Sequence, residues 1–235
     1  MNRAREVLGD YKSGTRLMYL GQDSYALTFP VAGGTSMNVA GFVTDKRPWE
    51  GAVDGKLKAG VGKLTAPATR ADAMAAYASF NPTVRAIMSM LPEELDKWAV
   101  FDTLDDPVPS YSSGRLALAG DAAHASCPHH GAGAGFGIED ALALATLLEA
   151  ANSGPSKAKT VAALEVYNNV RYERTQWLMQ SSRATGDFYT GRDPNVGRDF
   201  EKFGREIEWR SHKIWYYDVE GMAKGALANF RELVR

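Results

Sequence analysis

Apolar and polar residues alternate at strand spacing over the first part of the chain. Between residues 15 and 43, short apolar segments with aromatic and β-branched side chains are separated by Gly-Gln-Asp-Ser and Gly-Gly turns at hairpin spacing. This pattern predicts a small antiparallel sheet. Residues 48–67 are rich in glycine and follow no clear period, so we expect a connection there.

Helical spacing replaces strand spacing at Arg70. Ala73, Tyr77 and Phe80 recur on one face of the helix that begins there, and a second helix is expected after Pro82.

The remainder of the chain is predicted to be mainly helical. Residues 98–101 are expected to form one more strand. Residues 138–151 are strong helix formers, and the Asn-Ser-Gly-Pro sequence at 152–155 predicts where that helix ends. A long helix is expected over residues 160–185, with apolar positions on one side and dense charge on the other, and further helices over 196–235.

One segment concentrates the candidate chemistry, and it reads GRLALAGDAAHASCPHHGAGAGFGIED. Residues 115–119 form an apolar run of strand length, and Gly120 ends it with Asp121 placed where the end of a strand meets a ligand. Glycine at every second position from 131 to 137 leaves the backbone free of Cβ atoms, so that amides can approach a ligand before a helix opens near Ile138. The segment predicts half of a cofactor site.

Composition limits the class of protein. The chain has 235 residues, 45% hydrophobic and 23% charged, which is typical of a soluble globular protein. A net charge of −1 argues against nucleic acid or a membrane as partner, and no stretch approaches the roughly 20 apolar residues of a membrane span. The single cysteine, Cys127, excludes an internal disulfide framework, and the first residues lack a signal peptide's apolar core, so we expect a cytoplasmic, intracellular protein.

A nucleotide phosphate loop and a metal site are the alternatives to consider for the glycine segment. A strict G-x-G-x-x-G pattern fails because Phe136 and Ile138 stand where a third glycine belongs, and no Gly-Lys-Ser/Thr occurs. Metal-ligating residue types do crowd together, but no second cluster accompanies them and Pro128 bends the segment between them, so no metal is expected. They are Asp121, His124, Cys127, His129 and His130.

The motif GDAAHASCPHHGAGAGFGIEDA resembles the second flavin-binding motif of the FAD-dependent aromatic hydroxylases, the group A flavoprotein monooxygenases. Its flanks, WAVFDTLDDPVPSYSSGRLALAGD, YNNVRYERTQWLMQSSRATGDFY and KIWYYDVEGM, resemble corresponding regions of the salicylate hydroxylase-like branch. The resemblance covers most of the chain and implies an α/β (α+β) fold. An antiparallel substrate-domain sheet would join the C-terminal helical part of a FAD/NAD(P)-binding, Rossmann-like fold.

The resemblance also implies an organisation in three parts. Residues 1–107 would form the substrate-binding sheet with its helices, 108–155 the second flavin-binding motif, and 156–235 a C-terminal helical region. Family members begin with a strand, a G-x-G-x-x-G turn and a helix that hold the ADP half of FAD. This chain lacks that pattern, and the Asp54-Gly55 pair follows the sheet without the companions of the family's Asp-Gly motif. We therefore expect a C-terminal half that binds FAD weakly alone and needs a separate N-terminal dinucleotide-binding half, or self-association.

Cofactor contacts follow from the same resemblance. Asp121 would accept hydrogen bonds from ribityl hydroxyls, and Pro128 would shape the cavity at the reacting edge of the flavin. The glycine loop would offer amides to the flavin pyrimidine at a helix N-terminus. The implied cofactor-binding residues are Gly120, Asp121, Pro128, Gly131, Ala132 and Gly133.

Catalytic candidates are Pro128, His129 and His130, at positions where the family faces flavin or substrate. For both histidines a structural role is an equal alternative, and His124 is expected to be a packed histidine. Glu139 and Asp140 are expected to be first-turn acids that complement a helix dipole.

The implied activity is FAD-dependent, NAD(P)H- and O₂-dependent hydroxylation of a small aromatic substrate. A substrate pocket lined by Tyr19, Tyr25 and Phe29 is one interpretation of the sheet aromatics, and ordinary sheet packing is the other. Two further functions stay open: a cofactor-free isomerase or cyclase derived from this fold, and an inactive fragment or binding module.

Overall fold

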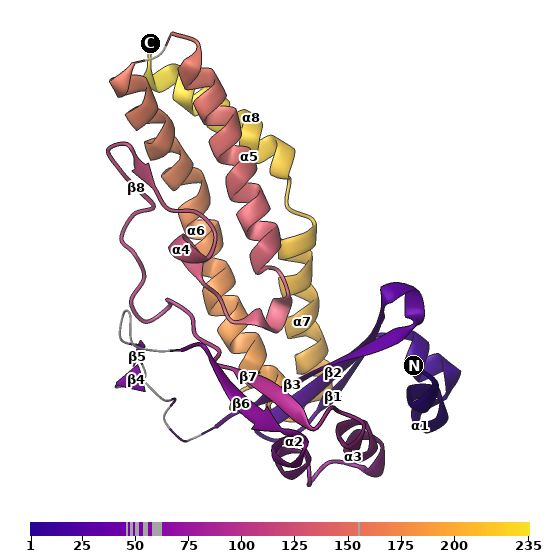
Figure 1. The fold of residues 1–235 in the computed structure, drawn as a ribbon. Coiled ribbons are helices and arrows are strands. Elements are labelled where there is room, and N and C mark those ends of the chain that lie inside the picture. The colour runs from indigo at the N-terminus through magenta and orange to yellow at the C-terminus, as the bar shows by residue number, and fades with distance from the viewer. Residues whose placement is uncertain (46, 48, 50–51, 54–55, 58–62, 155) are drawn as a thin grey trace. The chain divides into compact units, whose positions relative to one another are not determined.

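A computed structural model describes residues 1–45, 47, 49, 52–53, 56–57, 63–154 and 156–235, and Figure 1 shows their elements. The chain divides into two compact units. The first contains Met1–Val100 and Asp187–Arg198, and the second contains Phe101–Gly186 and Asp199–Arg235.

The first unit is built on antiparallel pairing. Strands β1, β2 and β3 form a sheet in that order, β6 pairs with β7, and β4 pairs with β5, all antiparallel. The elements are α1 (Asn2–Gly14), β1 (Leu17–Leu20), β2 (Ser24–Val31), the 3-10 turn η1 (Ala32–Gly34), β3 (Ser36–Val43), β4 (Ala52–Val53), β5 (Lys56–Leu57), β6 (Thr65–Thr69), α2 (Arg70–Ala76), α3 (Pro82–Ser89) and β7 (Glu94–Trp98). The predicted antiparallel sheet is confirmed.

Tyr77 joins the helices of this unit to the sheet. It is 2% exposed, packs with Ala26, Val84 and Met88, and donates its hydroxyl to the carbonyl of Tyr25 at 2.8 Å. Burial raises the pKa of Tyr77, which keeps the phenol a donor. Tyr77 therefore covers the sheet, but as the C-cap of α2: the helix ends at Ala76, before Phe80, which was predicted to lie on the same helical face.

The predicted starts of both short helices are also confirmed, and their caps explain them. Thr69 and Asp72 form a reciprocal capping box at the start of α2. Asn81 accepts from the amide of Val84 at 3.1 Å, with Pro82 in the first turn of α3.

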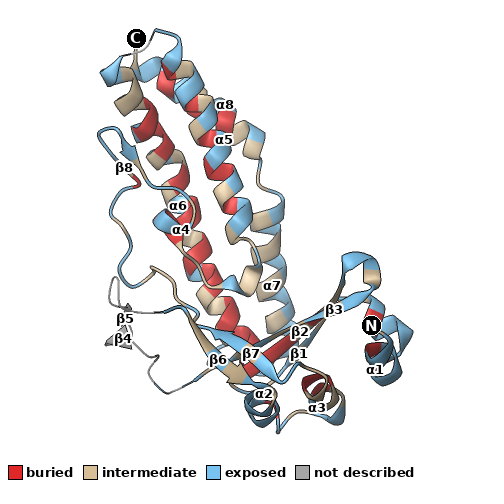
Figure 2. Cartoon of the chain, viewed as in Figure 1, coloured by how far each residue is buried: buried red, intermediate tan, exposed pale blue. Residues whose placement is uncertain are grey.

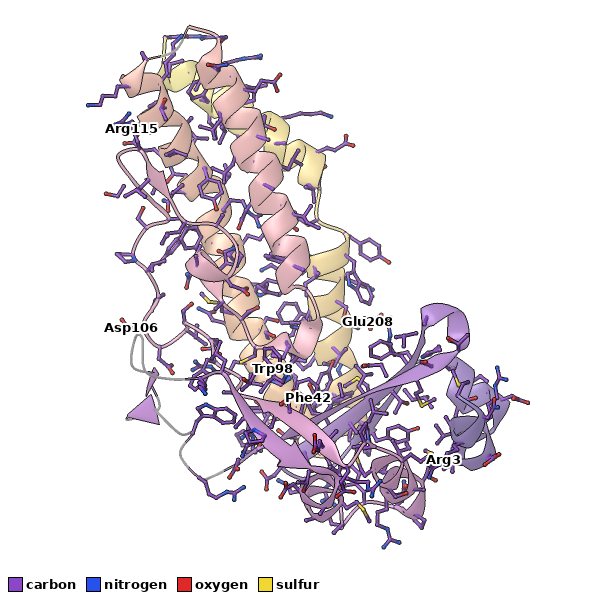
Figure 3. The ribbon with its side chains drawn as sticks, in the orientation of Figure 1. Arg3, Phe42, Trp98, Asp106, Arg115 and Glu208 are labelled. Carbon is purple, nitrogen blue, oxygen red and sulfur yellow. The ribbon has the colours of Figure 1, made fainter. Side chains whose placement is uncertain are left out.

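Two expectations for this unit were wrong. Strand β6 lies inside the segment expected to be connection, because Thr65–Thr69 pairs with Glu94–Trp98 despite its small side chains and Pro67. Strand β7 ends at Trp98, where a strand over 98–101 was predicted; Trp98 is 71% exposed and supplies no core contact there (Figure 3). Helix α1 was not anticipated. The Asp54-Gly55 pair lies outside the described residues.

The second unit is mainly helical. Its elements are the strands β8 (Ser112–Ser113) and β9 (Leu116–Ala117), α4 (Asp121–His124), the 3-10 turn η2 (Pro128–His130), α5 (Gly133–Asn152), α6 (Lys157–Tyr189, whose last residues belong to the first unit), α7 (Phe200–Trp215) and α8 (Val219–Leu233). Buried residues run along α5 and α6 (Figure 2). Its core is formed by Tyr111, Ala123, Ala143, Leu147, Ala151, Ala163, Val166, Tyr167, Ala226 and Phe230.

The mixed fold with antiparallel sheets and a C-terminal helical part confirms the predicted fold class. The two long helices were predicted but extend further than expected: α5 opens at Gly133, ahead of Ile138, and α6 spans Lys157–Tyr189. Across the described residues, no helix has the length and apolar character needed to cross a bilayer. The three-part division of the chain remains a prediction.

Candidate functional site

The turn that carries Asp121 is set by a glycine-only backbone conformation. Gly120 has φ 59° and ψ −142°, a region closed to residues with a Cβ, and the chain then enters α4 with Asp121 as its first residue. The amide of Gly120 donates to Oδ2 of Asp140 at 2.9 Å. Asp121 is exposed and its carboxylate makes no hydrogen bond with any described residue, so the carboxylate is available to a ligand.

The strand expected before this turn is short. Only Leu116 and Ala117 are in strand conformation, paired with Ser112 and Ser113, where residues 115–119 were predicted. Among the described residues β9 has no second neighbour, and Leu116 is 72% exposed. The strand is shorter than the apolar run because its ladder with β8 covers only two residues on each side.

The glycine loop ends in an open helix N-terminus. Gly131 adopts a left-handed conformation (φ 63°, ψ 24°) and donates its amide to the carbonyl of Pro128 at 3.0 Å. Helix α5 then begins without a side-chain cap. Its first amides find no acceptor among the described residues, as expected for a helix start left open to a ligand or solvent. They belong to Ala132, Gly133, Ala134 and Gly135.

Two glycines of this loop give a matched pair of substitutions. A Cβ at either Gly131 or Gly135 meets nothing within 4 Å, but only Gly131 has positive φ. We expect Gly131→Ala to destabilise the chain by about 1 kcal/mol through left-handed strain, and Gly135→Ala, inside α5, to stabilise it by about 0.5–1 kcal/mol. Urea denaturation of both variants checks this, and equal effects would contradict the assigned backbone conformation.

His130 is held by the hydroxyls of α6. Its Nε2 lies 2.9 Å from Oγ of Ser181 and 3.1 Å from Oγ1 of Thr185. Burial, together with the positive charge of Arg210, lowers the pKa of His130 to about 4. His130 is therefore neutral at pH 7, and these contacts favour an anchoring role for its ring.

The depressed pKa of His130 predicts a pH dependence of stability. As pH falls below 6.5, the unfolded chain takes up the proton first, so the contribution is complete above pH 6.5 and is lost toward pH 4. Because the ring is partly exposed, we expect a loss of about 1 kcal/mol in the free energy of unfolding between pH 7 and pH 5. His130→Gln should remove that slope in urea titrations at the two pH values; an unchanged slope would contradict it.

The other candidates of the loop occupy separate environments. Pro128 is exposed, and the ring of His129 lies against α6, where a Cβ on Gly186 would come within 2.5 Å of its Nε2. Cys127 donates its thiol to Oδ2 of Asp102 at 3.0 Å, and burial and this carboxylate raise its pKa to about 12. The residue types that suggested a metal therefore have different partners, and over the described residues no group of His, Cys, Asp and Glu could hold one.

Glu139 and Asp140 were expected to be first-turn acids of α5. They lie instead beyond its first turn, in a buried charge network. Asp140 is 0% exposed and accepts from Nε of Arg171 at 2.7 Å and from the ring of His124 at 2.7 Å. Arg171, also 0% exposed, donates to Glu139 at 2.6 Å. Against the cost of burial, the bonds from His124, Gly120 and Arg171 hold the pKa of Asp140 below its usual value.

Arg174 extends the network to the end of α7. It donates to both carboxylate oxygens of Glu139 at 2.8 Å and to the carbonyl of Lys213 at 3.1 Å, and its guanidinium lies 3.5 Å from the ring centroid of Tyr217. The sequence pattern predicted dense charge on one side of this helix but did not single out these arginines. Two arginines three residues apart, matched by adjacent acids in an otherwise apolar helix, were the signal that was available.

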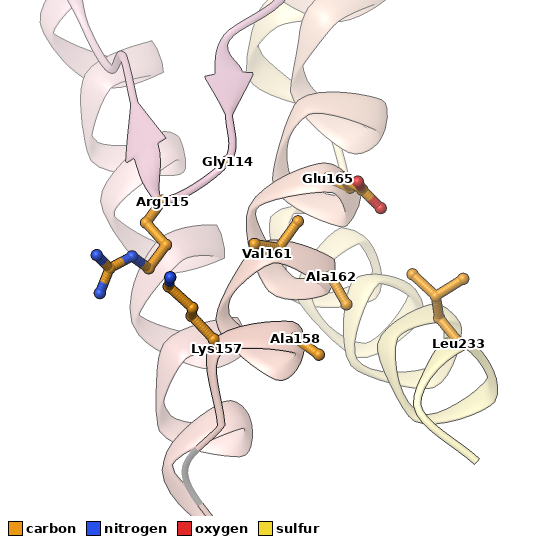
Figure 4. A pocket seen from close by; sticks show the side chains of 8 residues that line it. All are labelled: Gly114, Arg115, Lys157, Ala158, Val161, Ala162, Glu165 and Leu233. Atoms are coloured by element: carbon orange, nitrogen blue, oxygen red, sulfur yellow. The ribbon is translucent and has the colours of Figure 1, made fainter.

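Two pockets among the described residues lie away from the glycine loop. One, of about 540 Å³, is lined by Gly114, Arg115, Lys157, Ala158, Val161, Ala162, Glu165 and Leu233 (Figure 4). Another, of about 720 Å³ in the first unit, lies among α1, β3 and α3, and none of Tyr19, Tyr25 or Phe29 lines it. Tyr25 is instead stacked on Phe42 at 4.5 Å, which supports the sheet-packing interpretation for that residue.

Comparison with known proteins places this geometry in a family. The FAD binding domain family matches residues 62–182, more than half of the chain and the whole of the glycine loop. The chain belongs to this family.

Individual relatives and a solved structure agree with this family assignment. The chain is 49% identical over 99% of its length to the dual trans-enoyl reductase/FAD-dependent monooxygenase tazHJ of Aspergillus terreus, covering 34% of that protein. It is 48% identical over 98% of its length to the FAD-dependent monooxygenase pigN of Monascus ruber, covering 52% of it. A salicylate hydroxylase–substrate complex superposes with a TM-score of 0.82 at 34% identity, over 96% of this chain and 54% of that one.

These similarities confirm the predicted resemblance to FAD-dependent aromatic hydroxylases of the salicylate hydroxylase-like branch. The chain spans at most about half the length of these relatives.

Proposed function

We propose that this chain supplies the flavin-facing and substrate-facing half of an FAD-dependent monooxygenase that hydroxylates a small aromatic substrate. The observation that carries the proposal is the unoccupied hydrogen-bonding capacity at one end of α5: the open amides after Gly131 and, on the nearby turn, the unpaired carboxylate of Asp121. Donors at a helix N-terminus suit the electron-rich pyrimidine of a flavin, and an ionised carboxylate suits hydroxyl groups.

The residues present fit the cofactor's chemistry. Space is open above the glycines, since a Cβ at Gly120, Gly131 or Gly135 meets no atom within 4 Å. In the proposal Gly120 turns the chain so that Asp121 accepts from ribityl hydroxyls, and the amides of Gly131, Ala132 and Gly133 donate to the ring. When bound, the flavin supplies hydride acceptance from NAD(P)H and activation of O₂ for transfer to the substrate.

Side chains around the loop would shape the reaction space. Pro128 is exposed beside the loop and has no amide hydrogen to offer, so it would limit the cavity at the reacting edge. His129 and His130 would flank it; His130, neutral at pH 7, adds no charge to repel or attract a developing phenolate. We assign all three a positioning part in catalysis.

An uncovered apolar face of α5 points to the partner this half requires. While Phe136, Ala143 and Leu147 of α5 are buried, Ile138 is 71% exposed, and the apolar side chain one turn further along the helix is exposed as well. A helix that is apolar all round is a buried helix. The exposed members are Ile138 at 71%, Leu142 at 39% and Leu148 at 40%, to which β9 and its end add Leu116 at 72% and Leu118 at 36%.

We propose that a dinucleotide-binding half, of the kind that family members carry ahead of this region, covers this face. It would complete the ladder beside β9 and supply the contacts to the ADP part of FAD, whether it belongs to the same polypeptide or to another. The half-length match to the relatives supports this occupant. A second copy of this chain is the alternative occupant of the exposed face of α5.

Co-expression tests the proposal. The 235-residue chain is expressed with the N-terminal remainder of the Monascus ruber relative, and we expect co-purification with a bound flavin absorbance band and NAD(P)H oxidation. Ile138→Glu should abolish co-purification, whereas Phe200→Glu, at a residue 74% exposed on α7, should not. Recovery of neither flavin nor complex would contradict the proposal, and turnover of an aromatic substrate without flavin would favour a cofactor-free isomerase or cyclase.

A further inference from the structure

One buried carboxylate holds both ends of the short helix that carries Asp121. Helix α4 has only four residues, Asp121–His124, and no side-chain cap. Oδ2 of Asp140 accepts from the amide of Gly120, immediately before this helix, and from Nε2 of His124, its last residue. Asp121 therefore lies between two points fixed to the same oxygen atom.

The carboxylate itself is fixed from the opposite side. Oδ1 of Asp140 accepts from Nε of Arg171 at 2.7 Å, and Arg171 is further bound by Glu139 and by the carbonyl of Phe136 at 3.2 Å. Since Asp140 and Arg171 are 0% exposed and His124 is 1% exposed, water does not compete for these bonds.

We infer that Asp140 is a positioning residue, which orients the Gly120–Asp121 turn and so sets the direction in which the Asp121 carboxylate meets its ligand. Its link to flavin rests on the proposed function; its hold on the turn does not. A turn of four helical residues cannot stabilise itself, because a single helical turn is unfavourable in isolation. The orientation of Asp121 must therefore be imposed from outside α4; Ala123 packs in the apolar core, and Asp140 bonds at both ends of the helix.

An amide cannot replace this carboxylate. Oδ1 faces the N–H of Arg171, while Oδ2 faces the N–H of Gly120 and the ring of His124, so every neighbour is a donor. Asp140→Asn would turn an NH₂ toward one of these donors and lose at least one bond. Glu139→Gln removes the same charge one residue away, from the same network, without touching Gly120, and is the matched control.

The test uses the 235-residue chain, first without ligand and then with riboflavin. In Asp140→Asn we expect the amide of Gly120 to exchange with solvent at least about tenfold faster and its resonance to move, whereas Glu139→Gln should leave both near the wild-type values. Riboflavin affinity should fall about tenfold or more in Asp140→Asn only, because a misplaced contact group loses its bond. Equal changes of the Gly120 amide in the two variants, or none in Asp140→Asn, would overturn the inference.

Two safeguards keep the outcome decisive. If Asp140→Asn does not fold, the wild-type chain is examined for a scalar coupling across the hydrogen bond between the Gly120 nitrogen and the Asp140 carboxyl carbon, and its absence overturns the inference. If wild-type chain binds no riboflavin, the proposed function fails, while the exchange of the Gly120 amide still decides whether Asp140 positions the turn.

Discussion

Arg171→Met is expected to destabilise the second unit by about 3–5 kcal/mol, because it removes the cation that faces two buried carboxylates. Arg171 donates to Glu139 at 2.6 Å and to Asp140 at 2.7 Å and is itself 0% exposed. The methionine fills the volume but offers no donor. Glu139 keeps Arg174, so the uncompensated charge falls mainly on Asp140.

The size and the pH dependence of this loss are measured by urea denaturation. With its cation removed, Asp140 can relieve its buried charge by protonation, so the variant should be least destabilised at pH 5 and most at pH 8. Arg205→Met is the control: it is the same substitution in α7, where Arg205 is 64% exposed and 3.9 Å from Glu201, and little change is expected. Similar losses in both variants would contradict the buried network.

Asp121→Ala is expected to weaken riboflavin binding by ten- to a hundredfold, the range for loss of hydrogen bonds to a charged acceptor. Lumiflavin, which has the same ring but no ribityl chain, should bind the variant and the wild-type chain equally. Fluorescence titration with both compounds separates the contribution of the ribityl contact from that of the ring.

The fold should not change in this variant, because Asp121 is exposed and its carboxylate bonds to no other described residue. Asp96→Ala, at an exposed position on β7, is the control and should leave both affinities unchanged. If Asp121→Ala weakened lumiflavin and riboflavin by the same factor, Asp121 would not be the ribityl acceptor.

Local signals predicted much of the fold. The hairpin turns of residues 15–43, the helix starts at Arg70 and Pro82 and the two long helices all follow from patterns within a few residues of each element. Strand β6 was not predicted, because its partner, β7, lies far along the chain and its own side chains are small. Pairing of this kind is set by the neighbour, and a single segment does not reveal it.

In the site, too, features set by nearby residues were predicted and features set by distant partners were not. The glycine spacing located the loop and the turn at Asp121, since glycine at Gly120 and Gly131 is required by the backbone conformations found there. The role of Asp140 was missed because its partners come from other elements: Arg171 from α6, and His124 and Gly120 from around α4. A charge in an apolar helix indicates burial with a partner, but only the packing identifies that partner.

The central claim is that this chain binds the ring and ribityl half of FAD and leaves the ADP half to another segment. Fluorescence titration of riboflavin with the purified 235-residue chain, followed by addition of ADP, tests it most directly. We expect saturable quenching that excess ADP does not reverse. Failure to saturate up to the solubility limit of riboflavin, or release of riboflavin by ADP, would contradict it.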